Sequence, residues 1–288
     1  MITKTLTGVP FFDEHYGGIY RGRTMLVSGK SGSGKTVFGL QFIRQAIKQN
    51  ERCLILSGQP MNDLLIFAEA LKLPLSDAVE AGNLILLEYH NYIPIRDSEE
   101  YITLPPDGFL QFKEIIDAHA IQRIVLDTVL PWVSIRPQTN LAEHVYSFVR
   151  AFERIGVTTL MTIPKPASLP STRLKNALEE VAPVSVTLAN IPHSNDLVWI
   201  TNKYLGEMKL DKETPYQITP GLGIALKSGA VVTAAGPVAP APAPARPRAE
   251  AADASPNRKI KFSDIVATQT RGPTVKEKDL LSWLEKPK

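Results

Sequence analysis

The segment from Gly29 to Thr36 constrains the fold of this 288-residue chain more than any other feature. It reads Gly-Lys-Ser-Gly-Ser-Gly-Lys-Thr and fits the phosphate-loop pattern G-x-x-x-x-G-K-[ST]. The apolar run 25–28 before it predicts a strand, and residues 35 to 49 predict a helix. These are the two elements that such a loop joins, so the chain is expected to fold around a sheet with this loop at one strand end.

Each residue of this loop has an expected role in holding phosphate. The glycines let backbone amides curl around phosphate oxygens, and the following helix adds the positive end of its dipole. Lys35 is expected to pair with the β and γ phosphates, and Thr36 to offer its hydroxyl to Mg²⁺. The alternative is a glycine-rich turn with a chance lysine, although both flanking elements have the required type. The expected nucleotide contacts come from Gly29, Lys30, Ser31, Gly32, Ser33, Gly34, Lys35 and Thr36.

A second acidic component is expected at the end of a later strand. Residues 123–127 read Arg-Ile-Val-Leu-Asp, which predicts a buried strand that ends at Asp127. Because the carboxyl ends of parallel strands share one edge of a sheet, Asp127 is expected to hold the hydration shell of Mg²⁺. The alternative is a helix N-cap, which is a common role for an aspartate after a strand. The predicted cofactors are therefore ATP and Mg²⁺, with Thr36 and Asp127 at the metal.

Apolar runs alternate with amphipathic segments along the first 233 residues, which predicts an α/β fold with a mostly parallel sheet flanked by helices. Further strands are expected at 53–57, 84–89, 123–127 and 157–162, and at 184–188, 197–202 and 217–226, where they continue the sheet as hairpins. One helix face is formed by Val145, Phe148, Val149, Phe152 and Ile155, and Gly156 ends that helix. The single cysteine, Cys53, lies in an apolar run and is expected in the core.

The charge of the chain is divided unevenly between the body and the tail. Residues 1–233 carry 22 Lys and Arg against 23 Asp and Glu, a net charge of −1; residues 234–288 carry 10 against 6, a net charge of +4. A nearly neutral body argues against a large nucleic-acid footprint, which needs clustered cations. We expect a nucleotide-binding domain at 1–233, an extended Ala/Pro-rich linker at 234–256 and a basic amphipathic tail at 257–288 that binds a protein partner.

The sequence shows no pattern for targeting, membrane insertion or metal binding by histidine. The N-terminus lacks the apolar region of a targeting peptide, and no apolar stretch approaches the roughly 18 residues that span a membrane. We therefore expect a cytoplasmic protein without membrane insertion. The five histidines are scattered without cysteine or carboxylate partners at metal spacing, so no histidine metal site is expected.

A further group of segments lies directly before the strand and the loop: Thr7-Gly8-Val9-Pro10, Asp13, Gly17-Gly18 and Arg21-Gly22. These segments resemble the entry signature of the KaiC-like branch of the RecA superfamily, and the resemblance extends over about residues 5 to 228. It implies a RecA-type fold that assembles head to tail, usually as a hexameric ring, with ATP held between subunits. The tail is not part of the resemblance.

Two positions bear on catalysis in this resemblance. Lys203 matches the lysine that family members send across the subunit interface toward the neighbour's γ-phosphate, although Leu205 replaces the arginine of the same motif. A solvated lysine at a strand end is the alternative. Where KaiC-like ATPases carry paired glutamates after the second strand, this chain has Gly58 and Gln59. Glutamine can orient a water molecule but cannot accept its proton. Glu88, at the end of the next strand, is a candidate substitute base.

These features together indicate an ATP-binding, oligomeric switch or scaffold with slow or absent hydrolysis, which recruits a partner through its tail. One alternative is an active ATPase of clock or motor type. Another is a recombination accessory protein that binds single-stranded DNA, with segment 165–171 at the place of a DNA-binding loop. That segment carries one lysine and no aromatic residue, so a surface loop is favoured and nucleic-acid binding is not expected.

Overall fold

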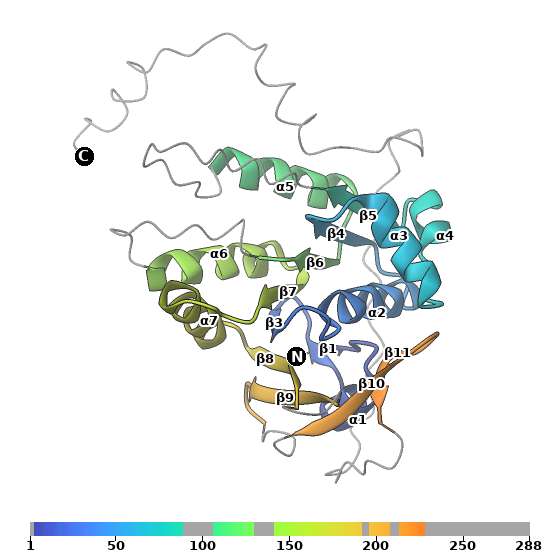
Figure 1. Ribbon diagram of the computed structural model, residues 1–288. Coiled ribbons are helices and arrows are strands. Elements are labelled where there is room, and N and C mark those ends of the chain that lie inside the picture. Colours follow the sequence, from blue (N-terminus) through green and yellow to red (C-terminus); the bar gives the residue numbers. More distant parts are fainter. Residues whose placement is uncertain (1–2, 89–105, 130–140, 192–195, 208–212, 228–288) are drawn as a thin grey trace, which may run out of the picture.

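The computed structural model describes residues 3–88, 106–129, 141–191, 196–207 and 213–227 (Figure 1). Within these residues the chain forms a nine-stranded sheet of order β11-β10-β9-β8-β3-β7-β6-β4-β5. The six strands from β8 to β5 are parallel, and β9, β10 and β11 join them as antiparallel strands. The predicted α/β fold with a mostly parallel sheet is confirmed.

The strands of the main sheet are β3 (Thr24–Gly29), β4 (Cys53–Ser57), β5 (Leu84–Glu88), β6 (Arg123–Asp127), β7 (Thr158–Pro164), β8 (Val184–Asn190), β9 (Leu197–Tyr204), β10 (Thr214–Thr219) and β11 (Gly223–Leu226). Two short strands, β1 (Lys4–Thr5) and β2 (Ile19–Tyr20), form a separate antiparallel pair. The helices are α1 (Pro10–Tyr16), α2 (Lys35–Lys48), α3 (Met61–Ala70), α4 (Ser76–Glu80), α5 (Pro106–Ala118), α6 (Leu141–Ile155) and α7 (Leu169–Val181).

Helices cover both faces of the parallel sheet. The core on one face joins α1 to α4 with the sheet, and the core on the other face joins α5, α6 and α7 with it. In β3, Met25 and Val27 belong to the first core and Leu26 to the second, which explains why three consecutive residues of this strand are apolar. The predicted helix after Asp127 is α6, in which Val145, Phe148, Val149 and Phe152 are buried and Ile155 is partly buried. Cys53 is fully buried as expected.

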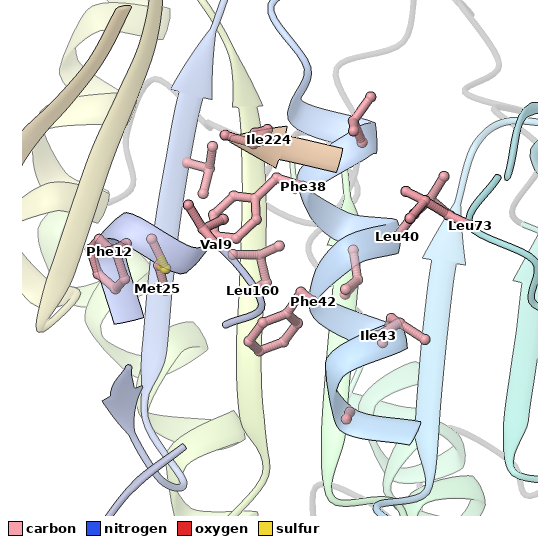
Figure 2. Close-up of a cluster of buried hydrophobic side chains, with 14 of the residues drawn as sticks. Val9, Phe12, Met25, Phe38, Leu40, Phe42, Ile43, Leu73, Leu160 and Ile224 are labelled. Carbon is pink, nitrogen blue, oxygen red and sulfur yellow. The ribbon is translucent and has the colours of Figure 1, made fainter. Parts of the chain in front are cut away.

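Helix α2 is the centre of the first core. Figure 2 shows Phe38 and Phe42 on one side of this helix, toward Leu160 and Ile224. Leu40 and Ile43 lie on the other side of the helix, with Leu40 next to Leu73. The helix is thus packed along its length, which fixes the position of the loop that precedes it.

The segment predicted as a single strand at 217–226 is two strands. Gly221 and Gly223 have φ angles of +83° and +79°, and residues 220–222 turn the chain so that β10 and β11 pair antiparallel. The segment 165–171, which was predicted to be a surface loop, is partly helical. Helix α7 begins at Leu169 with a capping box formed by Ser168 and Ser171.

The segment from Thr7 to Asp13, which belongs to the family resemblance, is held together by hydrogen bonds and contacts α2. The Asp13 carboxylate accepts hydrogen bonds from the backbone amides of Thr7 (2.8 Å) and Gly8 (2.7 Å) and from the Thr7 hydroxyl (2.7 Å). Burial raises the pKa of Asp13 to about 6, while these hydrogen bonds act in the opposite direction. The Gln41 amide of α2 donates to the Gly8 carbonyl, so the signature holds the helix that follows the phosphate loop.

A buried arginine at the start of β6 ties the same region together. Arg123 is fully buried, and its guanidinium donates to five acceptors from β1, the following residue, α2 and the segment before β4: Thr5 Oγ1, the Leu6 and Phe42 carbonyls, Gln49 Oε1 and Glu51 Oε2. Every N–H of the guanidinium therefore has an acceptor, as a buried charge requires.

The predicted linker and tail lie outside the described residues, which end at Lys227. Within the described part of the chain, no helix combines the length and apolar character needed to cross a bilayer.

Candidate nucleotide-binding site

The loop between β3 and α2 lies at the carboxyl end of the parallel strands, next to a reversal of strand order. Strand β3 has β7 on one side and β8 on the other, so later strands are added to the sheet on both sides of β3. Open α/β sheets bind ligands in the crevice at such a point. The fold therefore places Gly29–Thr36 where a ligand is expected.

The glycines of the loop stand where a side chain would clash or where the backbone takes a positive φ angle. A Cβ atom on Gly29 would meet the carbonyl oxygen of Leu188 at 2.6 Å and the hydroxyl of Ser33. Gly32 and Gly34 have φ angles of +76° and +91°, a conformation that favours glycine. Ser33 is buried and donates its hydroxyl to the Lys30 carbonyl at 2.9 Å, which closes the loop. This shape fits a backbone cradle for phosphate.

The ammonium of Lys35 lies inside the loop. It donates to the carbonyl oxygens of Gly29 (2.9 Å) and Lys30 (2.7 Å). Burial lowers the pKa of Lys35, and the negative charge of Asp127 opposes that shift. A phosphate oxygen is a stronger acceptor for an ammonium than a carbonyl, so this side chain is placed to exchange loop contacts for ligand contacts.

Thr36 and Asp127 meet across the end of the sheet. The Thr36 hydroxyl donates to one carboxylate oxygen of Asp127 at 2.9 Å, and the Thr162 hydroxyl of β7 donates to the other at 2.7 Å. Hydroxyl and carboxylate oxygens are the ligand types that Mg²⁺ takes in phosphate-loop sites. The two residues predicted for the metal are thus together, and Thr162 is a partner that the sequence did not reveal.

The β10–β11 hairpin supports the loop from the C-terminal side. The Tyr216 hydroxyl donates to the Ser33 carbonyl at 2.5 Å, and a Cβ atom on Gly34 would meet Ile218 at 3.1 Å. Gln41 of α2 accepts from the Ile224 amide at 2.8 Å. Tyr216 and Ile218 were not predicted to contact the loop, because they lie about 180 residues away in the chain.

The end of β4 brings Gln59 close to Asp127. The Gly58 amide donates to the Asp127 carbonyl at 3.4 Å, and the Gln59 amide donates to the Ser57 hydroxyl at 3.1 Å. The Gln59 side chain is exposed. Glu88 ends the neighbouring strand β5, where its carboxylate accepts from the Met61 amide in the first turn of α3 at 3.3 Å.

Lys203 does not join this group within one chain. It pairs with Ser185 near the start of β8, whereas Gly29 pairs with Leu188 farther along the same strand. The Lys203 ammonium donates to the Glu179 (3.1 Å) and Glu180 (2.6 Å) carbonyls at the end of α7. Burial lowers its pKa, and the two glutamates oppose that shift. Any contact of Lys203 with a phosphate would therefore be with another copy of the chain.

Sequence comparisons assign the family. A sequence model of the KaiC ATPase family matches residues 5–229, which include every site residue described above. This chain belongs to the KaiC family of ATPases. The KaiC match ends just after the last described strand, so the whole of the linker and the tail lies beyond it.

Curated KaiC proteins are similar to a part of this chain. The circadian clock oscillator protein KaiC of Acaryochloris marina is 27% identical over 165 residues, which cover 56% of this chain and 31% of that protein. The KaiC of Parathermosynechococcus lividus is 33% identical over 172 residues, with 56% and 30% covered. The circadian clock protein KaiC2 of Synechocystis is 28% identical over 166 residues, with 56% and 29% covered. The matches thus span about a third of the length of these KaiC relatives.

Proposed function

We propose that this KaiC-family chain binds ATP with Mg²⁺, hydrolyses it slowly or not at all, and acts as a nucleotide-dependent oligomeric switch or scaffold. The observation that carries the proposal is the contrast between two neighbouring strand ends. The phosphate loop with Lys35, and the Thr36–Asp127 pair, supply the residue types that hold phosphate and Mg²⁺ in phosphate-loop sites, which supports nucleotide binding here. The end of β4, which adjoins Asp127, carries Gln59 in place of a carboxylate.

The residues of the site have separate tasks in this proposal. The loop amides and Lys35 hold the β and γ phosphates, and Thr36 and Asp127 hold Mg²⁺, which neutralises phosphate charge when bound. Gln59 orients a water molecule through its amide but leaves the proton of that water without an acceptor. A slow chemical step makes the ATP-bound state long-lived, which suits a switch better than a motor.

An active ATPase of clock or motor type is the competing function, and it needs a carboxylate base near Asp127. Glu88 lies one strand farther from Asp127 than Gln59 does, and its carboxylate accepts a hydrogen bond from the first turn of α3. This contact supports a role for Glu88 in holding α3 rather than in catalysis. Turnover measurements separate the two functions.

We expect purified protein to exchange ATP much faster than it hydrolyses it, with turnover far below the ordinary enzyme range of about 1–10³ s⁻¹. Gln59→Glu should raise the rate at least about tenfold, because a positioned base typically contributes about 10²–10⁴-fold. Phosphate release and exchange of a labelled nucleotide are the two measurements. Glu88→Gln is the matched control and should leave the wild-type rate unchanged. Wild-type turnover within the ordinary range would refute the slow-switch proposal.

Assembly is the second part of the proposed function. Lys203 of β9 pairs with Ser185 of β8, three residues before the Leu188 that pairs with Gly29, and its ammonium contacts the end of α7 instead of its own loop. We infer that it senses the nucleotide of an adjacent copy. We expect light scattering to give a larger mass with ATP than with ADP, and Lys203→Ala to reduce the difference. Lys175→Ala is the matched control, since Lys175 binds Glu179 of the same helix but has no expected phosphate role. A mass that does not depend on nucleotide in the wild type would contradict the proposal.

The tail at 257–288 completes the scaffold proposal. Its apolar residues Leu280, Leu281, Trp283 and Leu284 are grouped beside charged residues, as in peptides that bind a partner as an amphipathic helix. The proposed role of this segment is to recruit a protein partner when the oligomer presents several tails together.

A further inference from the structure

Helix α3 exposes an apolar pair between acidic residues. Its outward residues form two adjacent rows at helical spacing, and we call them the α3 face: Asn62, Asp63, Ile66, Phe67, Glu69 and Ala70. Ile66 is 67% exposed and Phe67 is 38% exposed, although both are large apolar side chains. Asp63 precedes this pair by one helical turn, and Glu69 follows it.

The segment that carries this face is acidic. Residues 58–88 contain five Asp and Glu against one Lys, a net charge of −4. Leu169, which is 65% exposed on α7, shows the contrast, since the nearby charges Lys165 and Arg173 are basic. An apolar pair in an acidic setting selects for a basic amphipathic ligand.

The tail contains a segment with the complementary pattern. Residues 258–266 read Arg-Lys-Ile-Lys-Phe-Ser-Asp-Ile-Val, with three cations, one carboxylate and four large apolar residues. Ile260 and Phe262 alternate with Arg258, Lys259 and Lys261, so apolar and positive groups are both available to one partner. This segment is distinct from residues 280–284, which remain free for the partner of the proposed function.

We propose that the α3 face of one copy binds residues 258–266 of a neighbouring copy. The proposal rests on the proposed oligomeric function and names a contact that would link its subunits. In the bound state Ile260 and Phe262 cover Ile66 and Phe67, and Lys259 and Lys261 face Asp63 and Glu69. Helix α3 begins two residues after Gln59, so this contact would join the nucleotide site to the assembly.

The length of the linker favours a neighbour over the same chain. The 23 residues from 234 to 256 are rich in proline, and an extended proline-rich spacer covers about 3.1 Å per residue, or about 70 Å in total. A compact domain the size of the described body has a diameter of about 45 Å. An extended spacer of this length would reach beyond its own domain to the surface of an adjacent copy.

Cross-linking of two full-length variants tests the contact. One variant carries Ala70→Cys at the end of the α3 face, and the other carries Ser263→Cys beside Phe262, so both apolar pairs stay intact. Native Cys53 is fully buried, and burial raises its pKa to about 12, so it does not compete for a maleimide. The two proteins are mixed, Mg²⁺ and a non-hydrolysable ATP analogue are added, and a short bis-maleimide is applied. The expected product is a covalent dimer of one copy of each variant.

The matched control replaces Ala70→Cys by Ala167→Cys, an exposed small residue beside Lys165. A heterodimer yield no higher than with this control would overturn the proposal. A single chain carrying both Ala70→Cys and Ser263→Cys tests the other geometry. If only that variant cross-links, and it does so within one chain, the segment binds its own domain and the assignment to a neighbour is wrong.

A charge exchange tests the chemistry of the same contact. The pair Asp63→Lys and Glu69→Lys should lower the heterodimer yield about fivefold, because two exposed attractive pairs become repulsive. Adding Lys259→Glu and Lys261→Glu to the other variant should restore the yield, and no restoration would contradict the proposal. Mass measurement distinguishes the two proposals. If the mass rises with ATP but the cross-link does not form, the proposed tail contact is wrong and the nucleotide-dependent switch stands. If the cross-link forms but the mass does not depend on nucleotide, the switch is wrong and the contact stands.

Discussion

Replacing Lys35 by alanine is expected to lower the affinity for ATP at least about a hundredfold. The ammonium of Lys35 lies within the loop, where it donates to the Gly29 and Lys30 carbonyls, and we expect it to pair with the β and γ phosphates. Two charge-assisted hydrogen bonds contribute about 1.5–3 kcal/mol each, and the loop amides cannot supply a full positive charge in their place. Titration with a fluorescent ATP analogue measures the loss.

The control for this prediction is Lys48→Ala, at the opposite end of the same helix. This variant should bind ATP as the wild type does, and both variants should keep the circular-dichroism spectrum of the folded protein. If Lys35→Ala binds the analogue as tightly as Lys48→Ala, the site does not lie in this loop.

Replacing Arg123 by alanine is expected to lower the free energy of unfolding by about 3–5 kcal/mol. The substitution leaves the Glu51 carboxylate, which is 5% exposed, with a single arginine partner, Arg21. It also removes the donor from the Leu6 and Phe42 carbonyls. Unfolding in urea, followed by circular dichroism, measures the change.

Arg52→Ala is the matched control, because Arg52 directly precedes β4, the strand beside β6, is exposed, and donates to the His119 carbonyl at the surface. It should change the free energy of unfolding by less than about 0.5 kcal/mol. Arg123→Lys should fall between the two, since it keeps the charge but cannot reach five acceptors. Equal losses for Arg52→Ala and Arg123→Ala would show that the buried network does not stabilise the fold.

The sequence predicted the local parts of the site well. The loop is a contiguous motif between two elements of fixed type, so its position after β3 and before α2 follows from eight residues. Asp127 was predicted for a similar reason, because a run of apolar residues ends at a carboxylate. The structure brings Thr36 and Asp127 within hydrogen-bond distance, although their predicted contact with a metal stays a prediction.

Contacts that depend on register or on distant segments were not predictable. Thr162 reaches Asp127 because β7 lies beside β6 at a particular register, which no local pattern reveals. Tyr216 reaches the loop only because β10 and β11 fold back as a hairpin. Arg123 at the start of an apolar strand gave no sign of burial, since its five acceptors come from three separate parts of the chain.

The order of strands in the sheet also determines when the phosphate loop can form during synthesis. Strand β3, which leads into the loop, pairs only with β7 and β8, and these are made more than 120 residues later. At about 5–20 residues per second, a growing chain spends many seconds with β3 made but neither of its neighbours present. Residues 24–29 are then an apolar segment without a sheet around them, so a ribosome-bound intermediate needs protection there until β8 has emerged.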